Sequence, residues 1–202
     1  MKMDRKIRIP RQKRSIEKKN KIIDAAYKIF NEKGYNNTTT VDIAKEAGIA
    51  TGSVYAYFED KKDIFIQALH KYSNIMQELV LNKFNQIPIE EDLLSVIKQV
   101  INILIESHDL SKNLHNEIMA LSFLDEDIKN HFKNQHQQIT IRIFQQLEER
   151  NIIINNQKEK MFLALNTADN LCHELLFFHN SGLNKEVAID QCAYMIKCLL
   201  TY

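Results

Sequence analysis

The residues best suited to chemistry are glycines and hydroxyl side chains in one short segment, GIATGSVYAYF, residues 48–58. This segment holds two of the chain's four glycines, together with Thr51, Ser53, Tyr55 and Tyr57. Glycine accepts a positive φ and allows the backbone to come close to another surface. Hydroxyl groups can bind phosphate oxygens and base edges. Because a folding core needs neither feature, the segment predicts a surface that contacts a polyanion.

Seven histidines offer a second chemistry, because histidine serves both as a general base and as a metal ligand. All of them follow residue 69, and the sequence contains no HExxH or similar ligand spacing. It also contains no glycine-rich phosphate loop and no nucleophile elbow. We therefore predict no catalytic residue, no metal site and no cofactor. The alternative is a helical metal-dependent enzyme that uses His, Glu and Asp residues of the C-terminal part.

The composition favours a few long helices, because only four Gly and two Pro occur in 202 residues. The densest apolar run, residues 100–105, is too short to span a bilayer, and no apolar segment follows the basic N-terminus before Pro10. The three cysteines are odd in number and show no CxxC spacing. These features predict a cytoplasmic protein with reduced thiols and no membrane partner.

Charge is distributed unevenly along the chain. The formal net charge is +1, but residues 1–62 carry +7 and residues 63–202 carry −6. This division indicates a basic head that meets a polyanion and an acidic body that does not. A basic tail that is merely solvated is the alternative explanation.

Apolar periodicity predicts an all-α fold with a flexible basic arm at residues 1–14. A first helix should start near Ser15 and end at Gly34, with the glycine as a left-handed cap. The remaining helices are expected at 40–47, 51–57, 61–84, 90–107, 110–122, 125–150, 157–180 and 184–201. Residues 151–155 could be locally extended.

The two short helices have the spacing of a helix-turn-helix. Thr39 is the expected N-cap of the first, with Asp42 as its capping-box acid. Ala44 allows a close crossing, Gly48 makes the turn and Val54 fills the contact. A structural corner in which the tyrosines only pack is the alternative.

Residues 16–70 resemble the DNA-binding domain of the TetR family of bacterial transcriptional regulators. The resemblance rests on AAYKIFNEKGY, TTTVDIAKEAGI, GSVYAYF and KKDIF, and it covers about a quarter of the chain. It implies a helix-turn-helix domain at 15–60 and a helical effector-binding and dimerisation domain at 61–202. The implied protein is a homodimeric repressor that a small-molecule effector releases from a near-palindromic operator in double-stranded DNA.

The resemblance also implies roles for single residues. Thr39 and Thr40 would bind phosphate at the start of the second helix. Thr51, Gly52 and Ser53, at the start of the third helix, would face the DNA bases or backbone. Tyr55 and Tyr57 would bind phosphates, and Lys61 would bind another phosphate at the start of the fourth helix. Ala50 departs from the family, which often has a capping serine there, so Thr51 could take over the cap. Val41 stands where a polar residue is common.

The C-terminal part gives weaker signals. Polar or aromatic residues within its apolar helices are the candidates for an effector pocket: His115, Phe123, Asn166, Asp169, Asn170 and His173. The last two helices carry wide apolar faces that could build a four-helix interface about a twofold axis. Each of these residues could equally belong to a core or to a solvated face, and the effector itself cannot be identified from the sequence.

Overall fold

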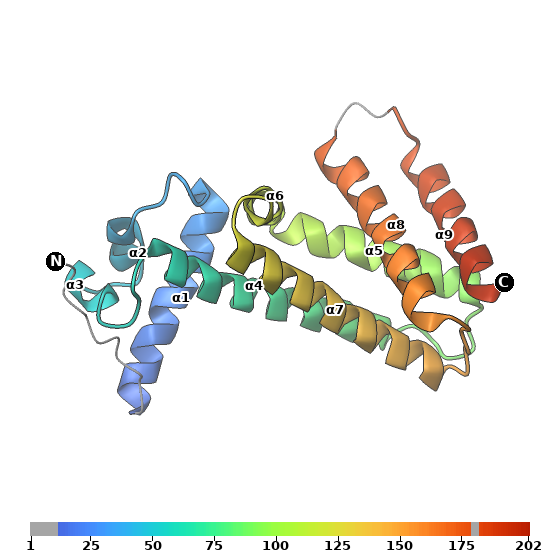
Figure 1. Cartoon of the computed structure of the whole chain (residues 1–202), viewed down its shortest axis with the longest axis horizontal. Helices are drawn as coiled ribbons and strands as arrows, with labels where there is room; N and C mark the ends of the chain where they lie inside the picture. The colour runs from blue at the N-terminus through green and yellow to red at the C-terminus, as the bar shows by residue number, and fades with distance from the viewer. Residues whose placement is uncertain (1–11, 179–181) are drawn as a thin grey trace. The chain divides into compact units, whose positions relative to one another are not determined.

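The computed structural model describes residues 12–178 and 182–202, and these residues form nine helices and no strand (Figure 1). The helices are α1 (Lys13–Lys33), α2 (Thr40–Glu46), α3 (Thr51–Val54), α4 (Lys61–Phe84), α5 (Leu93–Leu110), α6 (Lys112–Ser122), α7 (Glu126–Glu149), α8 (Gln157–Phe177) and α9 (Lys185–Thr201). The all-α prediction is confirmed. The predicted arm lies mostly outside the described residues, although α1 already includes Lys13 and Arg14.

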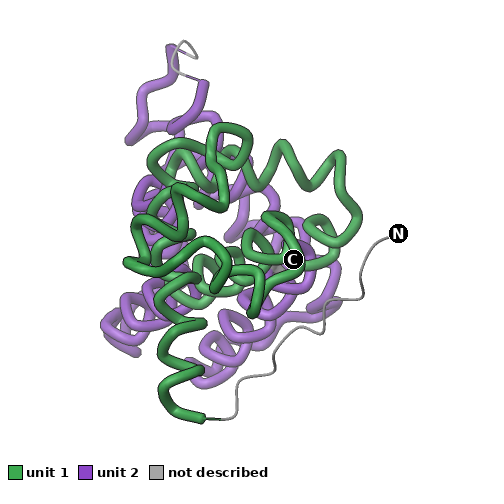
Figure 2. Tube along the Cα trace, turned by 90° about the vertical axis from the view of Figure 1, so that its left-hand side faces the viewer, with its two compact units in different colours: residues 1–75, 112–131 green, residues 76–111, 132–202 purple. Residues whose placement is uncertain are grey.

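The chain forms two compact units, which Figure 2 shows in different colours. Unit 1 comprises residues 1–75 and 112–131, and unit 2 comprises residues 76–111 and 132–202. Helices α4 and α7 each contribute to both units. The compact unit that contains the first three helices therefore also includes α6, residues 61–75 of α4 and residues 126–131 of α7, beyond the predicted boundary at residue 60.

In unit 1, α1 buries one apolar face, as its 3.6-residue period predicts. Ile22, Ala26 and Phe30 of this helix have no exposed surface. The Phe30 ring meets the Phe65 ring of α4 edge to face, with 5.0 Å between centroids. Such aromatic pairs contribute about 0.5–1.5 kcal/mol beyond the area that they bury. This aromatic contact fixes α1 against α4.

The peptide groups of Tyr35 tie three helices of unit 1 together. The Tyr35 amide donates to the Glu117 carboxylate of α6. The Tyr35 carbonyl accepts from the Lys61 ammonium of α4 at 2.8 Å, and the same ammonium lies 4.3 Å from the centre of the Tyr35 ring. Gly34 precedes this residue with φ 78°, and a Cβ there would come within 3.0 Å of the Glu117 carboxylate. The predicted stop at Gly34 is confirmed, but its ψ of 166° lies outside the left-handed helical region.

In unit 2, α5, α8 and α9 pack around a common core, and Figure 1 shows α8 and α9 side by side. Ile101, Cys172 and Ala193 are buried at its centre. Near the end of α7, the Arg150 guanidinium donates to the carbonyls of Ile87 and Pro88, both at 2.6 Å. These charge-assisted bonds satisfy carbonyl groups of the loop that follows α4.

Helices α3, α5 and α8 differ from their predicted ranges by three residues at one or both ends. Helix α5 begins three residues late, because the Asp92 side chain accepts from the amides of Leu94 and Ser95 and caps it. Helix α8 ends at Phe177. The non-helical link at residues 152–154 was expected. In the described part of the chain, we find no helix with the length and hydrophobicity that crossing a bilayer requires.

His131 gives unit 1 a measurable pH dependence. Burial, and then the nearby His70, lower the pKa of His131 to about 4, and the two rings lie 4.1 Å apart between centroids. The unfolded chain, with a histidine pKa near 6.5, therefore binds more protons than the folded chain between about pH 4 and 6.5. The free energy of unfolding should fall as the pH drops through this window. Urea unfolding between pH 4.5 and 7.5 should show a shallower slope for His131→Gln, and equal slopes would contradict the assignment.

Candidate nucleic-acid interface

Helices α2 and α3 form a tight pair through a small apolar contact. Ile43 and Val54 have no exposed surface, and Ala44 is 1% exposed where the helices cross. The turn between them is closed by the Ile49 amide, which donates to the Ala44 carbonyl at 3.0 Å. Gly48 has φ 66°, a conformation that costs other residues about 1 kcal/mol or more. The predicted geometry of the helix-turn-helix is confirmed by these contacts.

The start of α2 is held by a capping box. The Thr39 hydroxyl accepts from the Asp42 amide at 3.1 Å, and the Asp42 carboxylate accepts from the Thr39 amide at 3.0 Å. Hydrogen bonds from the Thr39 hydroxyl and Lys33, together with the Thr39 amide, lower the pKa of Asp42 to about 2. Thr39 is therefore the N-cap, as predicted, and its side chain is exposed.

Helix α3 is shorter than predicted and starts differently. It ends at Val54 instead of residue 57, and its N-cap is Ala50, which has no side-chain acceptor. Thr51 is the first helical residue, so the expectation that it takes over the cap is wrong. Gly52 is exposed, and Thr51 and Ser53 are half-buried.

The two tyrosines of this segment have different environments. Tyr55 is half-buried, and its hydroxyl hydrogen bonds with the Thr40 hydroxyl at 2.8 Å. Tyr57 is 5% exposed, and its hydroxyl hydrogen bonds with Ser15 of α1 at 3.1 Å. The prediction that Tyr57 presents its hydroxyl to phosphate needs correction, because its ring belongs to the apolar core between α1 and α3.

Lys61 also has a structural role. Its ammonium donates to the Tyr35 and Thr38 carbonyls at 2.8 and 3.0 Å. Two of its three donor positions are therefore used inside unit 1. A Lys61→Ala variant would disturb the fold as well as any phosphate contact, so it is a poor test of DNA binding.

The six predicted effector residues lie in different environments. In unit 1, His115 is buried and its Nδ1 hydrogen bonds with the Tyr72 hydroxyl at 2.6 Å, whereas Phe123 is 82% exposed. In unit 2, Asn166 and Asn170 are exposed. Phe123, Asn166 and Asn170 are thus exposed in their own units, and their contact with an effector stays a prediction.

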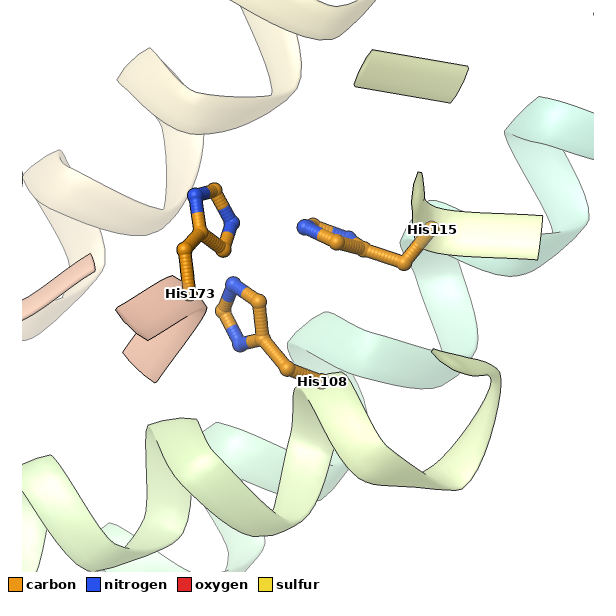
Figure 3. Close-up of side chains that lie close together, drawn as sticks. All are labelled: His108, His115 and His173. Atoms are coloured by element: carbon orange, nitrogen blue, oxygen red, sulfur yellow. The ribbon is translucent and has the colours of Figure 1, made fainter. Parts of the chain in front are cut away.

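Asp169 and His173 do lie together, and His108, which is not among the predicted residues, joins them. The Asp169 carboxylate is 2.9 Å from His108 Nε2 of α5 and 3.8 Å from His173 Nε2. Figure 3 shows the rings of His108 and His173 next to each other. The four-residue spacing of Asp169 and His173 was visible in the sequence. His108 comes from a distant helix, and no local pattern marked it.

Unit 2 also contains an apolar cavity of about 40 Å³. Its lining consists of hydrocarbon and thioether side chains, and none of the six predicted residues belongs to it. The lining residues are Phe84, Val96, Ile97, Val100, Ile101, Ile143, Leu147, Met161, Ala164, Leu165, Ala168, Ile196 and Leu200.

The cysteines are free thiols in the structure. Cys172 and Cys192 are buried in the core of unit 2, and this burial raises the pKa of both thiols. A buried neutral thiol reacts slowly with oxidants and electrophiles. These two residues therefore serve packing.

Comparison with known proteins finds a described family that the segment with α2 and α3 is similar to. Residues 22–68 match the sequence model of the family described as "Bacterial regulatory proteins, tetR family". The HTH-type transcriptional regulator HbdR of Aromatoleum sp. (strain CIB) is 49% identical over 53 residues, which are 26% of this chain and 23% of that protein.

Two further relatives match over longer segments. The fatty acid metabolism regulator protein of Bacillus subtilis (strain 168) is 34% identical over 94 residues, 45% of this chain and 47% of that protein. The biofilm operon icaADBC HTH-type negative transcriptional regulator IcaR of Staphylococcus aureus (strain Newman) is 38% identical over 68 residues, 34% of this chain and 37% of that protein. The aligned parts thus span less than half of the length of these relatives.

Solved structures are similar over nearly the whole chain. A putative TetR-family transcriptional regulator from Mesorhizobium loti superposes with a TM-score of 0.68 at 21% identity, covering 94% of this chain and 98% of that one. A putative transcriptional regulator from Saccharomonospora viridis, solved in complex with choline, gives a TM-score of 0.69 at 16% identity over 90% and 96%. At these identities the likeness concerns the fold.

The missing side-chain cap of α3 predicts a simple gain in stability. In Ala50→Ser, the new hydroxyl can accept from an amide in the first turn of α3, which should raise the free energy of unfolding by about 0.5–2 kcal/mol. Urea unfolding followed by circular dichroism measures the change. Ala50→Val, which adds volume without an acceptor, is the control. A serine variant no more stable than the valine variant would show that α3 does not use a cap here.

Proposed function

We propose that this chain, which belongs to the TetR family of bacterial regulatory proteins, is a transcriptional regulator that inserts α3 into the major groove of double-stranded DNA. The family match covers α2, its turn and α3, the elements that a helix-turn-helix uses to contact DNA. The proposed compartment is the cytoplasm. The relatives named above are transcriptional regulators, so we propose no enzymatic activity, and the alternative of a metal-dependent enzyme has no support among them.

The observation that carries the proposal is the environment of Gly52. A Cβ built on Gly52 would meet no other atom of the described residues within 4 Å, and its φ is not in the positive region. Nothing within the described fold therefore requires glycine there. A glycine in a first helical turn also loses stability relative to alanine. An outside surface that the backbone must approach closely explains why a side chain is absent, and the edge of a DNA backbone is such a surface.

The proposed interface consists of polar groups around this glycine. Thr40 and Tyr55 hold each other by a hydrogen bond, so their hydroxyls are oriented before any phosphate arrives. Thr51 and Ser53 flank Gly52 at the start of α3, where they would meet bases or backbone. Thr39 adds an exposed side chain at the start of α2. Tyr57 is not part of the proposed interface because it is buried. The main role of Lys61 is structural, since its ammonium binds two carbonyls of unit 1.

A dimer is proposed from an exposed apolar surface on α8 and α9. Phe162 and Leu163 of α8 are 63% and 50% exposed, and Tyr194 and Met195 of α9 are 60% and 54% exposed. The opposite side of α9, with Ile189, Ala193 and Ile196, is buried in unit 2. Two such helix pairs would cover one another about a twofold axis. Paired heads would then read two half-sites of a near-palindromic operator, about 34–36 Å or a multiple of this apart.

Repression and its release by a small molecule are the proposed mode of regulation. IcaR is named a negative transcriptional regulator, and one similar structure contains choline. The apolar cavity of unit 2 gives an effector a place to enter if the surrounding helices move. Helix α4 runs without a break from unit 1 into unit 2. A movement of its C-terminal part would therefore also move its N-terminal part, which belongs to the same unit as α2 and α3. A coupling of about 1–3 kcal/mol between effector and operator would be typical.

Gly52→Ala separates DNA contact from folding. The methyl group has room within the described fold but would collide with a DNA surface, so we expect an unchanged or slightly higher unfolding midpoint and at least about tenfold weaker binding. The operator is first recovered by selecting bound duplexes from a random pool, and binding is then measured by fluorescence anisotropy at fixed salt.

Gly48→Ala is the matched control. Because residue 48 has a positive φ, this substitution should lower both the free energy of unfolding and the affinity for DNA. The DNA-binding proposal would be contradicted if Gly52→Ala bound DNA as tightly as the wild type does, or if the selection from the random pool enriched no duplex.

The dimer proposal predicts that charge on the α8–α9 surface separates the subunits. Tyr194→Glu combined with Met195→Lys would place charges in an apolar interface, and each would occur twice across the axis. The dimer dissociation constant should rise at least about tenfold in analytical ultracentrifugation. Ile89→Lys removes an equally exposed apolar side chain outside α8 and α9 (67% exposed) and should leave the dimer intact. The same dissociation constant for both proteins would reject this surface.

A further inference from the structure

We propose that His108, Asp169 and His173 of unit 2 form a binding site for a divalent transition-metal cation. Figure 3 shows the two histidines; the third side chain drawn there, His115, belongs to unit 1 and is not part of the proposed site. Each of the two imidazoles offers one nitrogen, and these two atoms lie within 4.8 Å of each other. The Asp169 carboxylate has one oxygen toward each histidine, at 2.9 and 3.8 Å. The donor atoms of the three groups therefore lie close to one another.

The hydrogen bonds of His108 are satisfied when a proton or a metal ion lies between its Nε2 and Asp169. Nδ1 of His108 lies 2.7 Å from the Leu104 carbonyl oxygen, which can only accept, so Nδ1 carries the proton. In a neutral imidazole the other nitrogen, Nε2, then has a lone pair. This lone pair faces an oxygen of Asp169 at 2.9 Å. Two acceptors at this distance repel each other unless a proton or a metal ion lies between them.

The surroundings of His108 match those of a metal ligand. Histidines that bind metals commonly donate their second N–H to a backbone carbonyl or a carboxylate, which fixes the tautomer and the ring. His108 makes this bond within its own helix, and Ser107 donates to the same Leu104 carbonyl at 2.7 Å. Its side chain is only 8% exposed. The ring is thus held in place with Nε2 directed at Asp169.

His173 favours a metal over a proton alone. A single shared proton would satisfy His108 and one oxygen of Asp169. The second imidazole, one helical turn after Asp169 on α8, adds another nitrogen beside the second oxygen. Two imidazoles and one carboxylate are a donor set that suits zinc, nickel, cobalt or iron, whereas magnesium and calcium prefer oxygen ligands. Three protein ligands also leave a position for water or for an anionic group.

The cysteine thiols of unit 2 are the alternative ligands for a metal ion. Cys172 precedes His173 in the chain but has no exposed surface and belongs to the apolar core. Cys198 is the half-buried thiol of α9 and needs a control.

The test measures binding of Zn²⁺ and Co²⁺ to the full chain after treatment with a chelator and gel filtration. Competition with a chromophoric chelator should give one Zn²⁺ per chain. Asp169→Asn and His173→Gln should each weaken binding at least about tenfold. In Asp169→Asn the side-chain amide can donate to the lone pair of His108, so this variant should keep its fold, which circular dichroism verifies. His131→Gln removes a half-buried histidine of unit 1 and should bind as the wild type does.

The spectrum of bound Co²⁺ identifies the ligands independently. Ligation by histidine and carboxylate should give no thiolate-to-cobalt charge-transfer band, and Cys198→Ser should leave the spectrum unchanged. The proposal is overturned if the wild type binds no better than Asp169→Asn, which would leave a proton as the shared cation. A thiolate band lost in Cys198→Ser would also overturn it. Because no DNA is present, these results stand apart from the tests of the proposed function.

Discussion

The arrangement of unit 1 depends on how the backbone of Tyr35 is bonded. This residue follows the last turn of α1, so its own amide and carbonyl lie beyond the hydrogen-bond pattern of that helix. A carboxylate from α6 takes its amide, and an ammonium from α4 takes its carbonyl. Both bonds involve a charged group, which makes them stronger than bonds between neutral groups. Helices from three parts of the sequence are thereby fixed at one residue, and α2 and α3 continue directly from it.

Much of the fold could be predicted from the sequence because its signals are local. The period of apolar residues located the helices, Thr39 and Asp42 marked the start of α2, and the positive φ of Gly48 follows from the turn that it makes. Two of the ends that differ from the prediction lie next to side-chain hydrogen bonds. Asp92 caps α5, which starts three residues after the predicted start, and α3 ends before Tyr57, whose hydroxyl bonds with Ser15 of α1.

The sites were harder to predict because their residues meet only in three dimensions. The segment at 48–58 could be recognised as a candidate DNA-binding segment because its glycines and hydroxyl side chains lie close together in the sequence. Tyr55 and Tyr57 look equivalent in the sequence, yet one hydroxyl bonds with α2 and the other with α1. Asp169 and His173 could be selected from their spacing, whereas His108 joins them from α5, 61 residues away. Lys61 was selected as a phosphate ligand, and nothing in the sequence showed that two carbonyls already occupy its ammonium.

The purely hydrocarbon and thioether lining of the cavity in unit 2 limits how a bound molecule could be distinguished from its homologues. A cavity lined without hydrogen-bonding groups can distinguish ligands only by their size and shape, and each methylene contributes only about 0.8 kcal/mol on burial. Rejection of a wrong compound by unsatisfied polar groups, which can reach factors of about ten thousand or more, cannot operate in such a cavity. Members of a homologous series would therefore be ranked in steps of a few fold, and the resulting response would be graded with chain length.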